Sequence, residues 1–278
     1  HQSNIQKGRL DPVTEVDRAS EQAIVEFLAM HRPSDGILGE EGSSKDSGGR
    51  RWIIDPLDGT VNFIHGIPHI SVSVGLFDGE EALVGVIHDP MRNEVFAAAR
   101  GEGATCNGAP IRVSTTAEMH RAVVVTGFPY DHDRYADGYA HTVAAVLRAV
   151  NGLRRLGSAA LDFAWVAAGR FDAYWEYSLQ PWDMAAGALM IVEAGGMVAD
   201  IKGGDDFLHT GEIVAGSPGI AAVGAGVRAR AGHRDVGRVR HPSPGNDRVA
   251  KPIKRRRRVG RKKGVDPHLS RKPMGPLK

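Results

Sequence analysis

The chain has 278 residues, of which 42% are hydrophobic and 24% are charged, as expected for a globular protein with one large or two medium domains. No apolar run approaches the roughly 18 residues that a membrane span requires, so the composition excludes an integral membrane protein. The single cysteine, Cys106, excludes an internal disulfide and favours a reducing cytoplasm, where we expect the protein to reside.

The net charge of +2 conceals two segments of opposite sign. Residues 227–278 contain 18 Lys/Arg and 3 Asp/Glu, whereas the rest of the chain contains 17 basic and 30 acidic residues. An acidic body suits a cation-binding site. The tail has no sustained helical or strand period, so we predict that it is disordered. Its run "KRRRRVGRKK" (254–263) would bind nucleic acid through the phosphate backbone, without an aromatic platform for base stacking.

The first predicted elements are one helix and one short strand. Residues 14–30 are predicted as a helix, with Thr14 as N-cap and Asp17 three residues later. Its apolar face is formed by Ala19, Ala23, Ile24, Phe27 and Leu28. Residues 52–54 are predicted as a buried strand that ends at Asp55.

Two kinds of sheet are predicted further along the chain. Residues 70–113 indicate an antiparallel meander, with strands at 70–77, 81–88 and 94–100 and a hairpin turn at Asn107-Gly108. From about residue 121 strands and helices alternate, which predicts a second sheet covered by helices. The strands are expected at 121–128, 171–177, 196–201 and 212–217, and the helices at 135–150, 158–169 and 181–196.

The stretch "DPLDGT" (55–60) gathers oxygen ligands in a few residues. Pro56 fixes a turn that brings the Asp58 carboxylate back towards Asp55, with the Leu57 carbonyl between them. Such an oxygen set suits Mg²⁺, and the N–H groups of Gly59 and Thr60 could face a phosphate oxygen. The alternative is a polar turn, because Asp-Pro and Asp-Gly are common turn dipeptides.

Three other stretches favour a site over a turn. "GILGEEG" (36–42) presents two adjacent glutamates on a loop, and "QPWDMAAG" (180–187) places Asp183 in the first turn of a helix. "LGSAALD" (156–162) opens a helix with small residues, whose free N–H groups could bind an anion or a sugar hydroxyl. The alternatives are an acid favoured by the helix dipole for Asp183 and tight helix packing for 156–162. We interpret His65, His69 and His88 as structural, because their spacing is not that of metal ligands.

The chain resembles the inositol monophosphatase family in four motifs that occur in the family's order. They are "DPVTEVD" (11–17), "GEE" (39–41), "DPLDGTVNF" (55–63), and "WDMAAG" (182–187) with "EAGG" (193–196). The resemblance covers roughly residues 9–219. It implies a magnesium-dependent, lithium-sensitive phosphatase with an α+β or α/β fold, a layered α/β/α/β/α sandwich in which an antiparallel meander sheet accompanies a second mixed sheet.

The resemblance also implies a role for individual residues. The metal ligands would be Glu40, Asp55, Asp58, Asp183 and the Leu57 carbonyl, with Asp17 close by. Glu40 and Thr60 would orient the attacking water, with Asp55 beside them in the catalytic set. The substrate would contact Asp58, Gly59, Thr60, Arg154, Gly157, Ser158, Ala159, Glu176 and Asp183. Most metal ligands would then lie in residues 1–118, residues 119–222 would complete the site, and residues 223–278 would form the tail.

The implied reaction is hydrolysis of a small phosphorylated alcohol, with two or three Mg²⁺ ions that activate a water and stabilise the leaving group. Inositol monophosphate is the first candidate substrate, and a homodimer is implied. Histidinol phosphate, fructose bisphosphate and phosphorylated adenosine nucleotides are alternatives within the same chemistry. Two other classes stay open: a nucleic-acid-binding protein acting through its tail, and an inactive member lacking the long helix that usually precedes the 11–17 motif.

Overall fold

The computed structural model describes residues 5–6 and 12–221, all of which belong to one compact unit. The predictions of a disordered tail and of nucleic-acid binding through it lie outside the described residues. Among the helices that the structure describes, none has the length and apolar character needed to cross a membrane.

The predicted N-terminal helix is confirmed as α1, Glu15–His31. Its predicted apolar face is only partly right, because Leu28 is buried and Ile24 half-buried, whereas Ala19, Ala23 and Phe27 are exposed. Thr14 caps the helix by accepting a hydrogen bond from the Val16 N–H at 3.1 Å, and the Asp17 carboxylate accepts one from the Thr14 N–H at 2.9 Å. This reciprocal capping box satisfies donors that the first helical turn would otherwise leave without partners.

The first sheet has eight strands in the order β10-β9-β8-β7-β6-β5-β3-β4. Their bounds are β3 (Gly36–Gly39), β4 (Ser44–Lys45), β5 (Arg50–Asp58), β6 (Ser71–Asp78), β7 (Glu81–Asp89), β8 (Glu94–Ala99), β9 (Gly103–Cys106) and β10 (Ala109–Pro110). Strand β3 runs parallel to β5, and the other neighbours pair antiparallel. The predicted meander and its hairpin are confirmed, with positive φ at both Asn107 and Gly108, as such a turn requires. A separate pair is formed by β1 (Ile5–Gln6) and β2 (Pro12–Val13).

Strand β5 is longer than predicted. It does not end at Asp55 but continues to Asp58, with a register shift against β6 between these two residues. Pro56 lies in the shifted segment and has no N–H to donate to a neighbouring strand, so the pairing is interrupted there and resumes at Asp58. Gly36–Gly39 form β3, which was not predicted, and Glu40 and Glu41 lie in the turn that follows it, as expected for residues presented on a loop.

The second sheet has five strands in the order β12-β11-β13-β15-β14. They are β11 (Val123–Thr126), β12 (Gly152–Arg154), β13 (Ala173–Glu176), β14 (Met197–Ala199) and β15 (Ile213–Gly216). The sheet is mixed, because β11 is parallel to β12 and β13 whereas β15 is antiparallel to β13 and β14. The remaining helices are α2 (Thr60–Ile64), α3 (His132–Leu147), α4 (Ala159–Ala167), α5 (Pro181–Glu193), α6 (Phe207–Thr210) and a 3₁₀ turn at Met119–Arg121.

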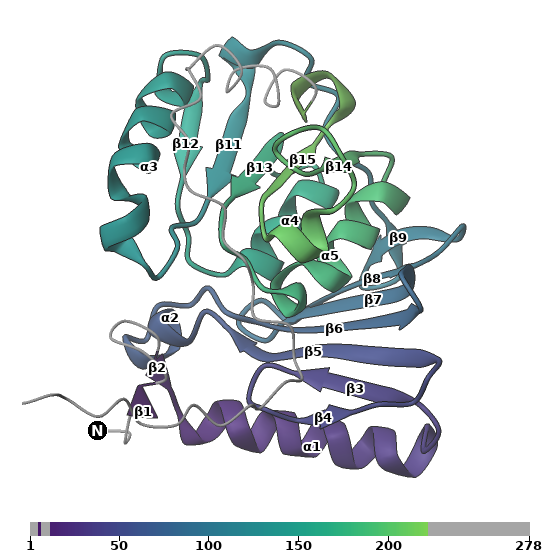
Figure 1. Ribbon diagram of the computed structural model, residues 1–278. Helices are drawn as coiled ribbons and strands as arrows, with labels where there is room; N and C mark the ends of the chain where they lie inside the picture. Colours follow the sequence, from purple (N-terminus) through teal and green to yellow (C-terminus); the bar gives the residue numbers. More distant parts are fainter. Residues whose placement is uncertain (1–4, 7–11, 222–278) are drawn as a thin grey trace, which may run out of the picture. The chain divides into compact units, whose positions relative to one another are not determined.

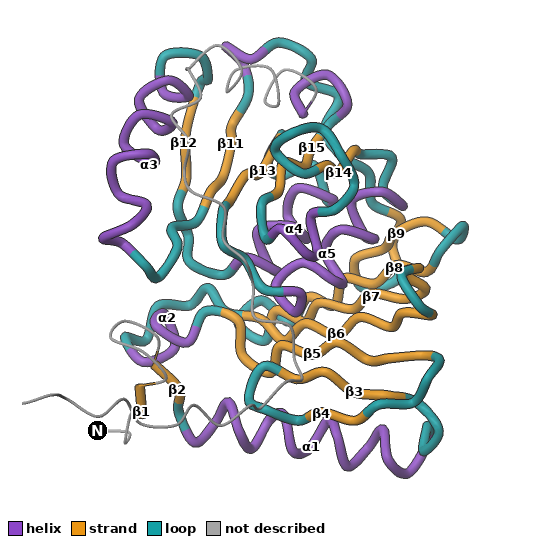
Figure 2. Tube along the Cα trace, in the orientation of Figure 1, coloured by secondary structure: helices purple, strands orange, loops and turns teal. Residues whose placement is uncertain are grey.

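Helices α4 and α5 lie between the two sheets (Figures 1 and 2) and contact strands of both. Helix α1 covers the other face of the first sheet, and α3 packs beside β12 of the second. This arrangement confirms the predicted layered fold. The largest core cluster joins Phe96 of the first sheet to Phe163 of α4 and Tyr174 of the second sheet. The two sheets thus share one core, and the boundary at residue 118 stays a prediction.

Helix α5 lies unusually close to the first sheet, and glycines on the strands make room for it. A Cβ atom at Gly85 would lie 2.6 Å from the Ala186 carbonyl oxygen, and one at Gly75 would lie 3.0 Å from the Ala185 Cβ. Alanines on the helix face those glycines, so neither partner has a side chain larger than one carbon at these contacts. The helix that carries Asp183 is therefore placed by small residues.

Candidate active site

A cavity of about 480 Å³ collects the four acidic residues that we predicted as metal ligands. Glu40 comes from the turn after β3, Asp55 and Asp58 from the end of β5, and Asp183 from the first turn of α5. The cavity is also lined by Gly59, Thr60, Phe128, Pro129, Tyr130, Asp131, Glu176, Ser178, Leu179, Gln180 and Trp182. Residues from distant parts of the chain thus meet in one site.

The turn that carries Glu40 is held in place by α1. The buried Glu21 carboxylate accepts hydrogen bonds from the N–H groups of Glu41 at 2.8 Å and Ser43 at 2.9 Å. The Glu40 N–H donates to the Ile54 carbonyl oxygen at 3.1 Å, which joins the turn to β5. Of the two adjacent glutamates, Glu40 lines the cavity.

Asp55 has only 2% of its surface exposed. Burial raises its pKa well above the usual range, and the neighbouring charges of Glu40, Asp58 and Asp183 raise it further. The Leu57 N–H donates to Asp55 Oδ1 at 3.1 Å. Among the described residues that line this cavity none is basic, so its negative charge meets the electrostatic condition for binding a cation.

Asp58 is fixed by four donors from two separate segments. Its Oδ2 accepts hydrogen bonds from the Ser158 hydroxyl at 2.5 Å, the Ala160 N–H at 2.7 Å and the Ser71 hydroxyl at 3.2 Å. Its Oδ1 accepts one from the Ala159 N–H at 3.1 Å. These bonds favour the carboxylate, although burial leaves its pKa raised. The predicted anion site at the start of α4 is therefore taken by a carboxylate of the chain itself.

Asp183 occupies the first turn of α5, after Pro181 at the first helical position. Its Oδ2 accepts a hydrogen bond from the Gln180 N–H at 2.7 Å. Burial raises its pKa well above the usual range, and the charge of Asp58 adds to this effect. The helix dipole accounts for an acid at this position, but Asp183 also lines the same cavity as Glu40, Asp55 and Asp58.

The carboxylates share a cavity without forming a ready ligand set. Within residues 5–6 and 12–221, no group of three or more acidic, histidine or cysteine side chains is gathered as closely as metal ligands are. Hydrogen bonds to backbone and hydroxyl donors hold Asp55, Asp58 and Asp183 in their present orientations. The residues have the chemistry of a site for a hard divalent cation.

Asp17 and Leu57 lie behind the cavity and contact Thr60. The Thr60 hydroxyl is 2.9 Å from Asp17 Oδ1 and 3.2 Å from the Leu57 carbonyl oxygen. One hydroxyl proton directed at Asp17 leaves the Thr60 lone pairs free to accept a hydrogen bond from the cavity side. The structure therefore places Asp17 so that it orients Thr60.

Gly59 has a φ of 95°, in the left-handed region that favours glycine. A Cβ atom here would lie 3.1 Å from the carbonyl oxygens of both His69 and Gly157. The backbone thus makes a sharp turn in a confined space between β5 and α2, and the predicted phosphate-binding role of its N–H would require that turn.

A smaller cavity of about 80 Å³ shares Asp58, Glu176 and Asp183 with the larger one. Gly157, Ser158 and Ala159 line it as well, so the residues predicted to hold the alcohol do converge. The predicted basic residue needs correction. Both arginines are exposed; Arg154 donates to the Leu153 carbonyl oxygen, and its neighbour Arg155 lines the cavity. Two adjacent arginines cannot be told apart by sequence position alone.

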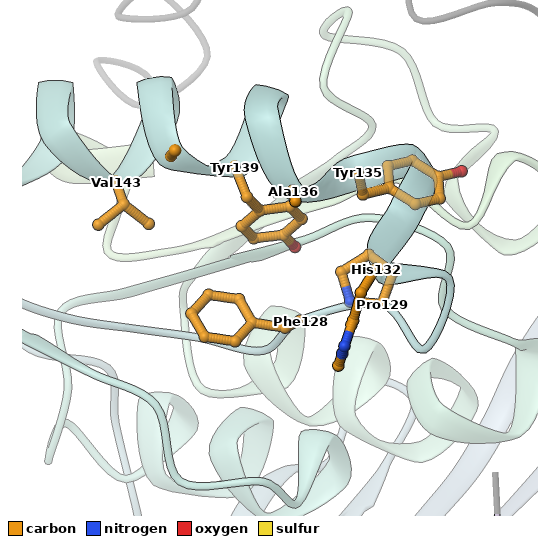
Figure 3. A pocket seen from close by; sticks show the side chains of 8 residues that line it. Phe128, Pro129, His132, Tyr135, Ala136, Tyr139 and Val143 are labelled. Atoms are coloured by element: carbon orange, nitrogen blue, oxygen red, sulfur yellow. The ribbon is translucent and has the colours of Figure 1, made fainter. Parts of the chain in front are cut away.

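The segment that follows β11 was missed by the sequence reading. Phe128 lines both cavities and also a third of about 410 Å³, which lies between the 128–129 segment and α3 (Figure 3). Its ring packs edge-on against Tyr139, with centroids 5.3 Å apart, and the Arg155 guanidinium lies 5.5 Å from its centre. The third cavity is mostly apolar, with Val143 on its wall. The "GFP" sequence at 127–129 has no motif that would have predicted this position.

Glu176 gives the metal-free protein a pH-dependent stability. Burial raises its pKa to about 8, although the Tyr174 hydroxyl donates a hydrogen bond to it. Because the unfolded chain ionises this group near its ordinary pKa of 4.5, unfolding releases a proton between these values. The free energy of unfolding therefore falls as pH rises through this window, by up to about 1.4 kcal/mol per pH unit.

We expect Glu176→Gln to remove that slope, because glutamine stays neutral in both states. Denaturant unfolding in EDTA at about pH 5 and pH 8, the limits of that window, measures it, with the exposed Glu102→Gln as a control for losing one carboxylate. The Glu176→Gln variant should gain stability relative to wild type at the higher pH and not at the lower one. If the free energy of unfolding depends on pH equally in Glu176→Gln and Glu102→Gln, Glu176 is not the source of the pH dependence.

A family model for the inositol monophosphatase family matches residues 1–231. The chain belongs to the inositol monophosphatase family. The family resemblance noted from the sequence motifs is thereby confirmed, and Glu40, Asp55 and Asp183, which belong to three of those motifs, line the carboxylate cavity.

Known members of the inositol monophosphatase family include relatives with two different names. The chain is 46% identical over 218 residues to Nus factor SuhB of Pseudomonas aeruginosa, covering 76% of this chain and 80% of the relative. It is also 46% identical over 221 residues to inositol-1-monophosphatase of Rhizobium meliloti, covering 77% and 82%. The crystal structure of extragenic suppressor protein suhB from Bartonella henselae matches with a TM-score of 0.79 and 42% identity, over 82% of this chain and 88% of that one.

Proposed function

We propose that this protein is a Mg²⁺-dependent phosphomonoesterase that hydrolyses a small phosphorylated alcohol, with inositol monophosphate as the first candidate substrate. The observation that carries the proposal is the single cavity lined by Glu40, Asp55, Asp58 and Asp183. A buried cluster of like charges is costly to maintain, and it is expected where a divalent cation offsets the repulsion.

The proposed metal ligands are these four carboxylates, with the Leu57 carbonyl as a further ligand. When bound, Mg²⁺ supplies a Lewis acid for the phosphoryl oxygens and lowers the pKa of a coordinated water. The chain's own residues then have positioning roles. Glu40 and Thr60 accept hydrogen bonds from the attacking water, and Asp17 keeps the Thr60 hydroxyl proton turned away from it.

The substrate's two ends would meet different parts of the site. The N–H groups of Gly59 and Thr60 are proposed to bind phosphate oxygens, because both residues line the cavity at the left-handed turn that leads into α2. The hydroxyl groups of the alcohol would face the smaller cavity at Ser158, Ala159 and Glu176. Arg155 takes the place that we first gave to Arg154 on the rim of that cavity.

We also propose that the protein forms a homodimer, as the family resemblance implies. Size-exclusion chromatography with light scattering would test this.

Phosphate release from inositol 1-phosphate and from histidinol phosphate, measured in parallel, tests the proposal. We expect release that requires Mg²⁺ and stops with EDTA, and the ester with the higher kcat/KM identifies the substrate class. Fructose bisphosphate and a phosphorylated adenosine nucleotide extend the same comparison. A folded protein that releases no phosphate from any of these esters in Mg²⁺ would refute the enzyme assignment.

A further inference from the structure

Two buried polar atoms beside the active site face each other without a proper hydrogen-bond partner. His69 Nε2 and Asp162 Oδ1 are 3.4 Å apart, and neither atom has another partner among the described residues. The side chains are almost fully buried, with 6% of His69 and 1% of Asp162 exposed. The separation is close enough for electrostatic contact but slightly longer than the about 2.7–3.2 Å of a good hydrogen bond.

Such atoms call for an explanation, because a buried polar group without a partner costs stability. The nearest ring offers His69 no alternative: the Trp165 ring lies edge-on to the imidazole, with centroids 5.1 Å apart, and its own Nε1 also lacks a partner within the described part of the chain. A shift of a few tenths of an ångström would close the gap between His69 and Asp162. Each is then the natural partner of the other.

The two residues lie in the two segments that hold Asp58. His69 precedes β6 by two residues, and β6 begins with Ser71, whose hydroxyl donates to Asp58. Asp162 lies one turn after Ser158 on α4, and its N–H donates to the Ser158 carbonyl oxygen at 3.0 Å. The contact between His69 and Asp162 thus spans the same two segments as the hydrogen bonds on the Asp58 carboxylate.

We propose that His69 and Asp162 form a hydrogen-bonded positioning pair that holds the first turn of α4 against the start of β6 and so fixes the orientation of the Asp58 carboxylate. The proposal rests on the proposed function in one respect, that Asp58 is a Mg²⁺ ligand. Asp162 also lines the smaller cavity that we propose for the alcohol, but the positioning role itself requires no contact of either residue with substrate or metal. Asn62 supports the same junction, since its side-chain amide donates to the carbonyl oxygens of His69 at 2.7 Å and Leu156 at 2.8 Å.

The protonation of the pair is consistent with a hydrogen bond between neutral partners. Burial lowers the pKa of His69 to about 4, and burial together with the charge of Asp58 raises the pKa of Asp162. A protonated Asp162 can donate to the neutral imidazole at Nε2. An asparagine at position 162 has nearly the same shape and can donate through its amide, so it should replace the aspartic acid.

Calorimetric titration of Mg²⁺ into the whole protein tests the pair, together with kcat and KM for the ester preferred in the phosphate assay. Asp162→Asn should keep the Mg²⁺ Kd within about twofold of wild type. Asp162→Leu and His69→Phe should each weaken Mg²⁺ binding by about fivefold or more, the factor that one lost hydrogen bond predicts. The double variant His69→Phe/Asp162→Leu should be no weaker than either single one, because both remove the same interaction.

Asp172→Leu is the matched control for a purely structural loss. Asp172 is also buried and accepts hydrogen bonds from Ser114 and from the Val123 N–H, away from the carboxylate cavity. Its substitution should lower the melting temperature and leave the Mg²⁺ Kd unchanged. If Asp162→Leu behaves in the same way, or if Asp162→Asn is as impaired as Asp162→Leu, the positioning role is wrong.

If Asp162→Leu does not fold, the comparison of His69→Phe with Asp162→Asn decides the proposal by the same criteria. Wild-type protein that binds Mg²⁺ but releases no phosphate contradicts the proposed function alone, because the Kd values of the variants still report on the pair. Wild-type protein that does not bind Mg²⁺ overturns both.

Discussion

Asp55→Asn is expected to abolish Mg²⁺-dependent phosphate release, with kcat/KM falling by at least about 100-fold. Loss of residues that merely support metal ligands costs about 10–100-fold, and a direct ligand should cost more. In EDTA the same variant should be more stable than wild type, because it removes one of the charges that Glu40, Asp58 and Asp183 oppose. Activity and stability thus move in opposite directions.

The measurements are a phosphate assay across Mg²⁺ concentrations and thermal unfolding with and without Mg²⁺. Asp46→Asn, which changes an exposed aspartate outside the cavity, is the control and should match wild type in both. Retained activity in Asp55→Asn would show that the cavity is not the metal site. If Asp55→Asn is less stable than wild type in EDTA, the Asp55 carboxylate contributes more to the fold than its repulsion by the other carboxylates costs.

Asp58→Ala is expected to lower the free energy of unfolding by about 3 kcal/mol in EDTA, in addition to abolishing activity. The substitution removes the acceptor for the Ser71 and Ser158 hydroxyls and for the two N–H groups at the start of α4. Buried donors left without an acceptor cost about 1–3 kcal/mol each, and relief of charge repulsion offsets part of that cost.

Denaturant unfolding of Asp58→Ala and Asp58→Asn, compared at one pH, measures the effect. Asparagine keeps one acceptor oxygen and should lose about half as much stability as alanine. The exposed Asp137→Ala on α3 serves as a control and should stay within about 0.5 kcal/mol of wild type. An Asp58→Ala protein as stable as that control would mean that the four donors find other partners.

The fold was largely predictable where one sequence pattern extends over a whole helix or strand. Helix α1 has a capping box at Thr14, and the meander has alternating strands with an Asn107-Gly108 turn, so sequence and structure agree there. Strand β3 was missed because its four residues begin and end with glycine and pair in parallel with a strand that follows it in the chain. Two apolar residues between glycines are too few to show the alternation of a strand, and the parallel pairing cannot be seen in the neighbouring sequence.

The extent of β5 and the identity of the basic rim residue depend on tertiary contacts. A strand with an internal proline reads as two elements, and only pairing with β6 on both sides of Pro56 joins them. The choice between Arg154 and Arg155 depends on which way the backbone turns after β12. The contact between His69 and Asp162 joins residues far apart in the chain, and reading each histidine by its spacing to other ligands gave no reason to expect it.

The acidic residues of the site were identifiable for a different reason. At Asp55, Asp58 and Asp183 the local patterns favoured a cation site but left a polar turn or a helix-dipole acid open, and the resemblance to the family's motifs decided between them. The hydrogen bonds that orient them could not be predicted, because they come from Ser71, Ser158 and other groups on separate segments.

The glycines of β6 and β7 have a consequence for the spacing of the carboxylates that line the cavity. Since a Cβ atom at Gly75 or Gly85 would lie within 3.0 Å of Ala185 or Ala186, the gap between helix and sheet at this point has no room for a side chain on either strand. Asp183 lies in the first turn of the same helix, and Asp55 belongs to the same sheet. The separation between Asp55 and Asp183 therefore depends on the contact of the two glycines with Ala185 and Ala186, which lies outside the cavity. An alanine at position 75 or 85 would push α5 away from the sheet. It would thereby change the distance between the Asp55 and Asp183 carboxylates without changing any residue that lines the cavity.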